Sequence, residues 1–112
     1  MHMIEAVVKP QKLDAVKTAL AKLGILGVTA VDCRGFGRQL GHTEHYRGAR
    51  VDVNFLPKVL LKICVRSTDL EPAVATIVES ARTGEVGDGK VFVYPIQQAI
   101  RIRTGERNES AL

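Results

Sequence analysis

The chain has 112 residues and a net charge of +4; 46% of its residues are hydrophobic and 25% are charged. This length and composition predict one domain over residues 1–112 and exclude a disordered or collagen-like chain. Every apolar run is shorter than the ~18 residues of a membrane helix. The first residues lack a signal-peptide core, so we expect a cytoplasmic protein. The basic balance favours anionic partners such as nucleotides, nucleic acid or acidic membranes, although a solvated basic surface explains it as simply.

The first third of the chain predicts a strand, a helix and a second strand. Apolar residues alternate over residues 3–9, which predicts a strand ended by Pro10. Over residues 13–23 they recur at helical spacing, and Gly24 follows as a C-cap. The β-rich residues 28–35 then predict the second strand.

The rest of the chain predicts the same order of elements. Residues 59–66 predict a third strand with apolar residues on both faces, which indicates that both faces are covered. Residues 67–69 (Ser-Thr-Asp) offer N-cap side chains for a second helix, whose apolar stripe runs over residues 70–81. Residues 91–94 predict a fourth strand, and alternation over residues 100–103 predicts a final one. The polar residues 106–112 predict a loose tail.

The simplest fold with these elements in this order is a ferredoxin-like α+β sandwich, with a four-stranded sheet and both helices on one face. Leu60 and Cys64 would leave the other face apolar, which predicts a homo-oligomer. Residues 37–54, between the second and third strands, hold three glycines and many charges without helical periodicity. Loops of this length are usually functional or disordered. Cys33 and Cys64 form no CxxC pair, so we interpret them as small buried residues rather than as disulfide or zinc ligands.

A glycine-rich segment, GEVGDGKV at residues 84–91, nearly matches the phosphate-binding loop GxxxxGK[ST]. Val91 replaces the hydroxyl that would hold magnesium, and a strand rather than a helix follows. Closely spaced glycines still allow backbone N–H groups to converge on an anion, and Lys90 adds a charge. The simpler alternative is a helix-to-strand turn with Gly87 and Gly89 at positive φ.

A second segment, RGFG at residues 34–37, matches the start of the RNP1 motif of RNA-recognition domains. The positions that should carry stacking aromatic residues hold Arg38 and Leu40 instead. The segment also lies on the second predicted strand, whereas RNP1 belongs on the third. An RNA-binding module therefore stays an alternative.

Two further patterns are weaker indications of a ligand site. Alternation places Arg101 and Arg103 on one strand face, where two guanidinium groups could grip a polyphosphate or form an exposed basic edge. His42 and His45 have a spacing that could ligate a metal, although solvated loop residues explain them more simply. No serine or cysteine lies in a recognisable nucleophile motif, so we expect that the protein is not an enzyme.

Taken together, these segments resemble the PII nitrogen-regulatory signalling proteins from Ile4 to Arg103. Residues 83–93, TGEVGDGKVFV, fit the family's C-terminal signature T-x3-GDGK-[IV]-F-V at every position. The segments GFGRQ, GHTE, YRG and FLPK between residues 35 and 58 fit its central block, and RIRTGE at residues 101–106 fits its C-terminal stretch.

The resemblance implies a ferredoxin-like homotrimer that binds ATP or ADP in clefts between subunits. By this resemblance Arg101 and Arg103 would come from the neighbouring chain. Gln39 would coordinate a magnesium ion that bridges ATP and 2-oxoglutarate, and Lys58 would pair with the distal carboxylate of that acid. The residues that match the family's nucleotide site are Thr29, Gly37, Arg38, Gln39, Cys64, Gly87, Asp88, Gly89, Lys90, Arg101 and Arg103.

The resemblance also identifies residues 37–55 as the T-loop, through which the family contacts its targets. Tyr46, Arg47 and Arg50 would contact the partner, and we expect an Amt-type ammonium channel at the inner face of the membrane. Relatives carry a nucleotidylated tyrosine or a phosphorylated serine in this loop. This chain has Val51 and Ala49 there, so we expect no covalent modification.

Position 62 often holds glutamate in the family and is Lys62 here. It lies on the same strand face as Lys58, about 13 Å away at ~3.3 Å per residue, so a base replaces an acid that could balance Lys58. We expect a nitrogen-regulatory sensor of ATP or ADP and 2-oxoglutarate, with Mg as a bound effector and no catalytic cofactor. The alternatives are a PII-like sensor of adenine nucleotides or another metabolite without a 2-oxoglutarate response, and a small RNA-binding module.

Overall fold

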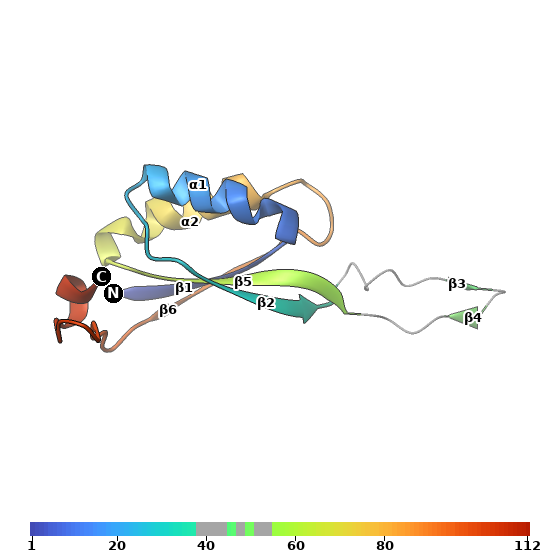
Figure 1. The fold of residues 1–112 in the computed structure, drawn as a ribbon. Coiled ribbons are helices and arrows are strands. Elements are labelled where there is room, and N and C mark those ends of the chain that lie inside the picture. The colour runs from blue at the N-terminus through green and yellow to red at the C-terminus, as the bar shows by residue number, and fades with distance from the viewer. Residues whose placement is uncertain (38–44, 47–48, 51–54) are drawn as a thin grey trace.

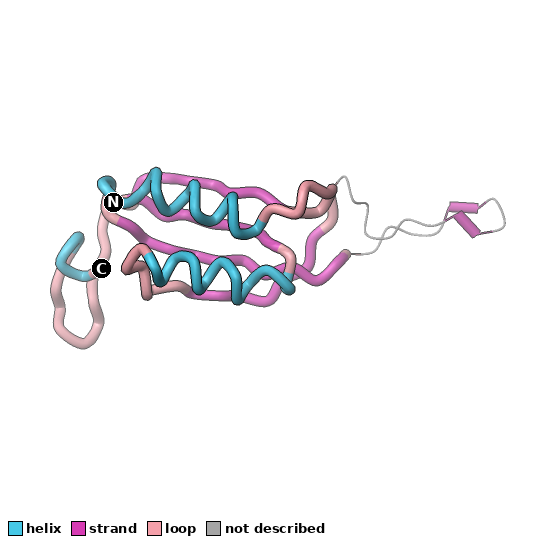
Figure 2. The backbone as a smooth tube through the Cα atoms, turned by 90° about the horizontal axis from the view of Figure 1, so that it is seen from above, coloured by secondary structure: helices cyan, strands magenta, loops and turns pink. Residues whose placement is uncertain are grey.

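A four-stranded antiparallel sheet carries two helices on one face (Figures 1 and 2). The computed structural model describes residues 1–37, 45–46, 49–50 and 55–112, with the backbone alone at residues 45, 46, 49 and 50. The strand order is β2-β5-β1-β6, so β2 and β6 are the edges of this sheet. This is the expected ferredoxin-like arrangement. Its elements are β1 (His2–Val8), α1 (Leu13–Lys22), β2 (Thr29–Gly35), β5 (Leu56–Val65), α2 (Leu70–Ala81) and β6 (Gly89–Pro95).

The core lies between the sheet and the two helices. Alternate residues of β1 and β5 point into it, because successive side chains of a strand face opposite sides. Val16 and Leu20 of α1 and Ile77 of α2 are fully buried against them. Ala73 of α2 is fully buried as well. The buried strand residues are Ile4, Ala6, Val8, Val59, Leu61, Ile63 and Val65.

The opposite face of the sheet, which we call the open sheet face, is partly apolar. In the ladder Val31 lies beside Leu60, and Leu60 beside Val7, so an apolar row crosses three strands. Phe92, on the same face of β6, is 51% exposed. A face of this kind, without helices over it, supports the expectation of self-association.

Strand β5 begins at Leu56, earlier than predicted, and includes Pro57. The ladder with β1 reaches only to the Val8–Val59 pair, whereas the ladder with β2 continues to the Gly35–Leu56 pair. Pro57 therefore has a strand neighbour on one side alone, where the missing N–H of a proline is tolerated.

The helix ends agree only in part with the predicted caps. Gly24 has a φ of 82° and its N–H donates to the Ala21 carbonyl, so it ends α1 as predicted. The prediction of side-chain caps for α2 is wrong. Asp69 stands at the N-cap, but its φ and ψ are already helical and its carboxylate accepts from Arg66 Nε at 3.2 Å. A capping side chain normally requires extended backbone at this position.

The predictions for the C-terminal segment are also wrong. Residues 100–103 form no strand: Ile100 makes a single bridge to Arg107, and a turn lies between them. Gly105, with a φ of 73°, closes this turn through its N–H bond to the Arg101 carbonyl. The predicted loose tail instead forms the short 3-10 helix Asn108–Ala111, and the Asn108 N–H bonds to the Ala99 carbonyl at 2.7 Å.

The connection between β2 and β5 carries the predicted T-loop. Within it β3 (His45–Tyr46) pairs antiparallel with β4 (Ala49–Arg50), beyond the ends of β2 and β5 (Figure 1). Residues 38–44, 47–48 and 51–54 of the T-loop lie outside the described residues. No helix in the described part of the chain has the length and apolar character to span a membrane.

Candidate functional site

The segment between α2 and β6, residues 83–89, forms a turn that we call the glycine loop. Gly84, Gly87 and Gly89 have φ values of 90°, 102° and 103°, a region that side chains rarely adopt. A Cβ atom on Gly89 would lie 1.7 Å from the Val7 carbonyl oxygen. Glycine is therefore required where the loop enters β6 and passes close to β1. The predicted positive φ values at Gly87 and Gly89 are confirmed, as the simple turn requires; they are also compatible with a phosphate-binding loop.

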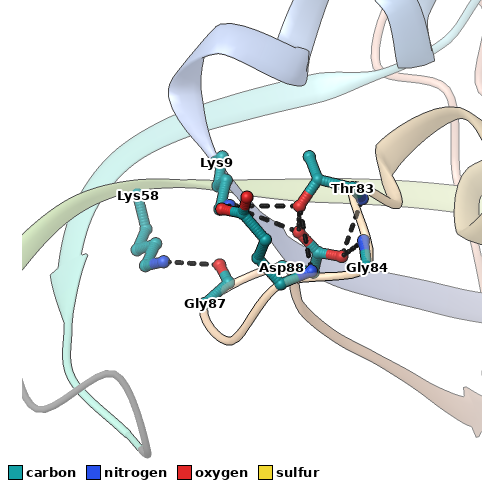
Figure 3. Close-up of polar contacts among 7 residues, drawn as sticks. Lys9, Lys58, Thr83, Gly84, Gly87 and Asp88 are labelled. Carbon is teal, nitrogen blue, oxygen red and sulfur yellow. Dashed lines mark hydrogen bonds and ion pairs between the residues drawn. The ribbon is translucent and has the colours of Figure 1, made fainter.

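The carboxylate of Asp88 faces the start of the same loop (Figure 3). It accepts hydrogen bonds from the Thr83 N–H at 2.7 Å, from the Gly84 N–H at 2.9 Å and from the Thr83 hydroxyl. Lys9 Nζ lies 3.4 Å from Asp88 Oδ1. These contacts, the Thr83 hydroxyl first, hold the pKa of Asp88 well below its usual range.

Lys58 connects β5 to the glycine loop. Lys58 is only 8% exposed, and its Nζ donates a hydrogen bond to the Gly87 carbonyl at 2.7 Å (Figure 3). Burial lowers the pKa of Lys58, and the nearby charge of Lys9 lowers it further. The ammonium group thus lies next to the loop predicted to hold phosphates.

A cavity of about 490 Å³, which we call the loop cavity, brings one half of the predicted site together. The glycine loop, the end of β2 and the start of β6 surround it. Its lining includes Gly37, Lys58, Gly87, Asp88, Gly89 and Lys90.

A second cavity of about 830 Å³, which we call the terminal cavity, contains Thr29 and Cys64. Lys62 lines it as well, because Lys62 lies opposite Thr29 in the ladder. Burial raises the pKa of the Cys64 thiol. Cys33 and Cys64 are both only half-buried, so the prediction that they are small buried residues is met in part.

The two cavities lie toward opposite ends of the sheet. Cys64 is six residues beyond Lys58 on β5, which is roughly 20 Å at ~3.3 Å per residue. One chain by itself therefore does not bring Thr29 and Cys64 to the glycine loop.

Arg101 is held within the C-terminal segment. Its guanidinium donates to Glu106 Oε1 at 3.1 Å and to the carbonyls of Ala111 and Leu112 at 3.4 and 3.2 Å. Ala111 and Leu112 also line the terminal cavity. Arg103 is exposed in the turn. The prediction that both arginines share one strand face is wrong, because Gly105 turns the chain back after them.

Several predicted site residues lie outside the described residues or lack described side chains. Arg38, Gln39, His42, Arg47 and Val51 are outside. Only the backbone is described for Tyr46 in β3, and for Ala49 and Arg50 in β4. In the described ranges no group of three His, Cys, Asp or Glu side chains could hold a metal ion.

Sequence reasoning missed Lys9 as part of the site. Its side chain is 15% exposed and reaches Asp88 across 79 positions of sequence. The only local signal was a lysine directly after a strand, which is too common to be informative. The RNP1-like segment, in contrast, begins on the last two residues of the edge strand β2 and continues beyond it, where Phe36 packs edge-on against Phe55 with ring centroids 4.9 Å apart. Its position on an edge disfavours an RNA-binding face.

Comparison with known proteins gives matches along nearly the whole chain. The family model described as Nitrogen regulatory protein P-II matches residues 1–106. Proteins of that name from Haemophilus influenzae and Pasteurella multocida are 54% and 53% identical over 112 residues, 100% of both chains in each case. Nitrogen regulatory protein P-II 1 of Escherichia coli is 51% identical over the same span.

The fold of this chain also matches that of a solved structure. The crystal structure of Arabidopsis thaliana PII bound to citrate matches with a TM-score of 0.81 at 43% identity, covering 98% of this chain and 87% of that one. The relatives are named as regulatory proteins, in keeping with a signalling role. The sequence and structural matches together show that this chain belongs to the nitrogen regulatory protein P-II family.

Proposed function

We propose that the protein is a homotrimeric, non-catalytic sensor that binds ATP or ADP between its subunits and, together with Mg-ATP, binds 2-oxoglutarate. The observation that carries this proposal is the separation of the two halves of the site within one chain. The loop cavity holds the glycines and Lys90, whereas Thr29 and Cys64 line the terminal cavity. A second copy that packs on the open sheet face would supply the missing half to each site.

The nucleotide would lie across two neighbouring chains. Gly37, Gly87, Gly89 and Lys90 from one chain surround a space suited to phosphates, since glycine backbone and an ammonium group suit anions. The terminal cavity of the next chain, with about 830 Å³, is large enough for the adenosine part. Arg38 would join the phosphate contacts, together with Arg101 and Arg103 from that next chain.

The metabolite would bind beside the phosphates. Lys58 supplies a cation for its distal carboxylate and already lies 2.7 Å from the glycine loop. Gln39 would contribute an amide oxygen to the magnesium ion, with phosphate oxygens completing its ligands. This suits magnesium, which usually takes only a few ligands from the protein.

The T-loop, residues 37–55, would carry the signal to a partner. Tyr46, Arg47 and Arg50 would contact it, and a cytoplasmic sensor that docks on an Amt-type ammonium channel is the form we propose. Mg-ATP with 2-oxoglutarate would favour one arrangement of the base of the loop and ADP another, without modification at position 51. Because binding linkage is reciprocal, Mg-ATP must strengthen 2-oxoglutarate binding as much as the acid strengthens that of Mg-ATP.

A subunit-mixing experiment tests the shared site. Lys90→Ala impairs the loop half and Thr29→Tyr fills the terminal half, so trimers of either variant should not bind ATP. Refolding the two variants together in equal amounts should restore about a quarter of the sites, because each site draws its halves from two randomly assorted chains. A mixture that binds no more ATP than the separate variants would contradict a site between subunits. Wild-type protein refolded in parallel controls for losses.

One feature bears on the alternative, a sensor that does not respond to 2-oxoglutarate. Lys62 Nζ lies 3.7 Å from Glu5 Oε1 on the open sheet face, and Lys62 also lines the terminal cavity beside Thr29. A cation there changes the charge around the adenosine half of the site. ATP binding that is unaffected by 2-oxoglutarate would favour this alternative, and Lys62→Glu would then test the residue directly.

A further inference from the structure

The glycine loop is built around an acid that faces inward. Asp88 lies between two glycines, a position from which it could be expected to contact a bound phosphate group. Its carboxylate instead accepts from Thr83 N–H at 2.7 Å, from Gly84 N–H at 2.9 Å and from the Thr83 hydroxyl (Figure 3). The end of the loop is thereby tied back to its beginning.

Lys9 joins this arrangement from the end of β1. Its Nζ lies 3.4 Å from Asp88 Oδ1 and 3.9 Å from Glu85 Oε2, and it donates to the Thr83 hydroxyl at 3.3 Å. With 15% of its side chain exposed, Lys9 is more enclosed than an ordinary surface lysine. The sheet is therefore connected to the loop through charged and hydrogen-bonded side chains as well as through the β1–β6 ladder.

This geometry is poorly suited to direct ligand contact by Asp88. The Asp88 carboxylate accepts three hydrogen bonds and lies beside one ammonium group, so these four partners take up the roughly four lone-pair positions of a carboxylate. A bare carboxylate beside a polyphosphate would repel it, and Lys9 offsets that charge. The network thus fixes the loop, and the ammonium group of Lys9 offsets the charge of the Asp88 carboxylate.

We propose that Lys9, Thr83 and Asp88 are positioning residues, which hold the glycine loop in the shape that receives the phosphates of a nucleoside polyphosphate without touching them. This inference rests on the proposed nucleotide-binding function. It reassigns Asp88 from a ligand contact to a support of the loop, and it gives Lys9 and Thr83 a role in binding.

Titration calorimetry with ATP and with adenosine tests the proposal on the full chain. Thr83→Val and Asp88→Asn should each weaken ATP binding about 10-fold to 100-fold, the range for the loss of residues that orient a binding group. Adenosine binding, measured by competition, should change less than about threefold, because the terminal cavity is distant. Thr83→Ser keeps the hydroxyl and should restore near wild-type ATP affinity. Asp14→Asn, an exposed acid on α1, is the charge-matched control.

The double variant separates positioning from contact. Because the Thr83 hydroxyl and the Asp88 carboxylate belong to one hydrogen-bond network, Thr83→Val with Asp88→Asn should lose less ATP affinity than the sum of the two single losses in binding free energy. Wild-type affinity for ATP in Thr83→Val, with a loss in Asp88→Asn alone, would show that Asp88 contacts the ligand and would overturn the proposal. If either variant fails to fold, Lys9→Met takes its place as the variant that should weaken ATP binding but not adenosine binding, and Thr83→Ser remains the variant that should bind ATP almost as the wild type does. If the wild-type protein binds no nucleotide, the proposed function fails first and this inference falls with it.

Discussion

Replacing Gly89 by alanine tests the close approach between the glycine loop and β1. The added Cβ atom would lie 1.7 Å from the Val7 carbonyl oxygen and 2.8 Å from its carbon. Those are backbone atoms of a strand paired on both sides, so they cannot simply rotate away. The positive φ alone costs about 1–2 kcal/mol, and overpacking adds about 1–3 kcal/mol. We therefore expect Gly89→Ala to lower the free energy of unfolding by roughly 2–5 kcal/mol.

Gly84 provides a matched control within the same loop. Its φ is also positive, at 90°, but an added Cβ atom would meet nothing within 4 Å. Gly84→Ala should therefore cost only the conformational part, about 1–2 kcal/mol. Urea denaturation at one fixed protein concentration measures both variants, because the stability of an oligomer depends on concentration. Equal losses of unfolding free energy in the two variants would refute the close approach of the loop to β1.

Three further predictions concern the core, the metabolite site and the T-loop. Leu20→Ala removes a fully buried side chain and should lower the free energy of unfolding, measured by urea denaturation, by about 2–5 kcal/mol. A loss below about 1 kcal/mol would contradict the burial of Leu20 in the core. The affinity for 2-oxoglutarate should fall as pH rises through the lowered pKa of Lys58, since only the ammonium form pairs with a carboxylate. Calorimetry at a series of pH values should show that this fall begins below the pH expected for an ordinary lysine. An affinity that does not change with pH would count against Lys58. Mass spectrometry of T-loop peptides from native cells should show no added group at Ala49 or Val51, and a mass shift there would overturn that expectation.

The sheet and its core could be predicted because their signals are local. Alternation at Ile4, Ala6 and Val8 identifies the buried face of β1, and the helical spacing of Val16 and Leu20 identifies that of α1. The apolar second face of β5 at Leu60 also indicated a surface beyond the single-chain core. These patterns follow from the repeat of the backbone itself.

The missed features depend on contacts that no short pattern contains. Arg101 alternates with apolar residues as in a strand, but the turn at Gly105 and the bond to Glu106 decide its conformation. Lys9 meets Asp88 only after the whole fold has formed. The GDGK motif identified the loop correctly, yet it could not show that the Asp88 carboxylate points inward, since that depends on Thr83 and Lys9.

Calorimetric titration of the wild-type protein with 2-oxoglutarate, once alone and once saturated with Mg-ATP, would show whether the two ligands bind as a coupled pair. We expect binding only in the presence of Mg-ATP, because in the proposed site Gln39 would reach the acid through the magnesium ion and Lys58 would pair with it beside the phosphates. ATP binding without any 2-oxoglutarate response would contradict the coupled sensor and leave an adenine-nucleotide sensor, with Lys62 as the first residue to test. Binding of neither ligand would contradict the proposed function altogether.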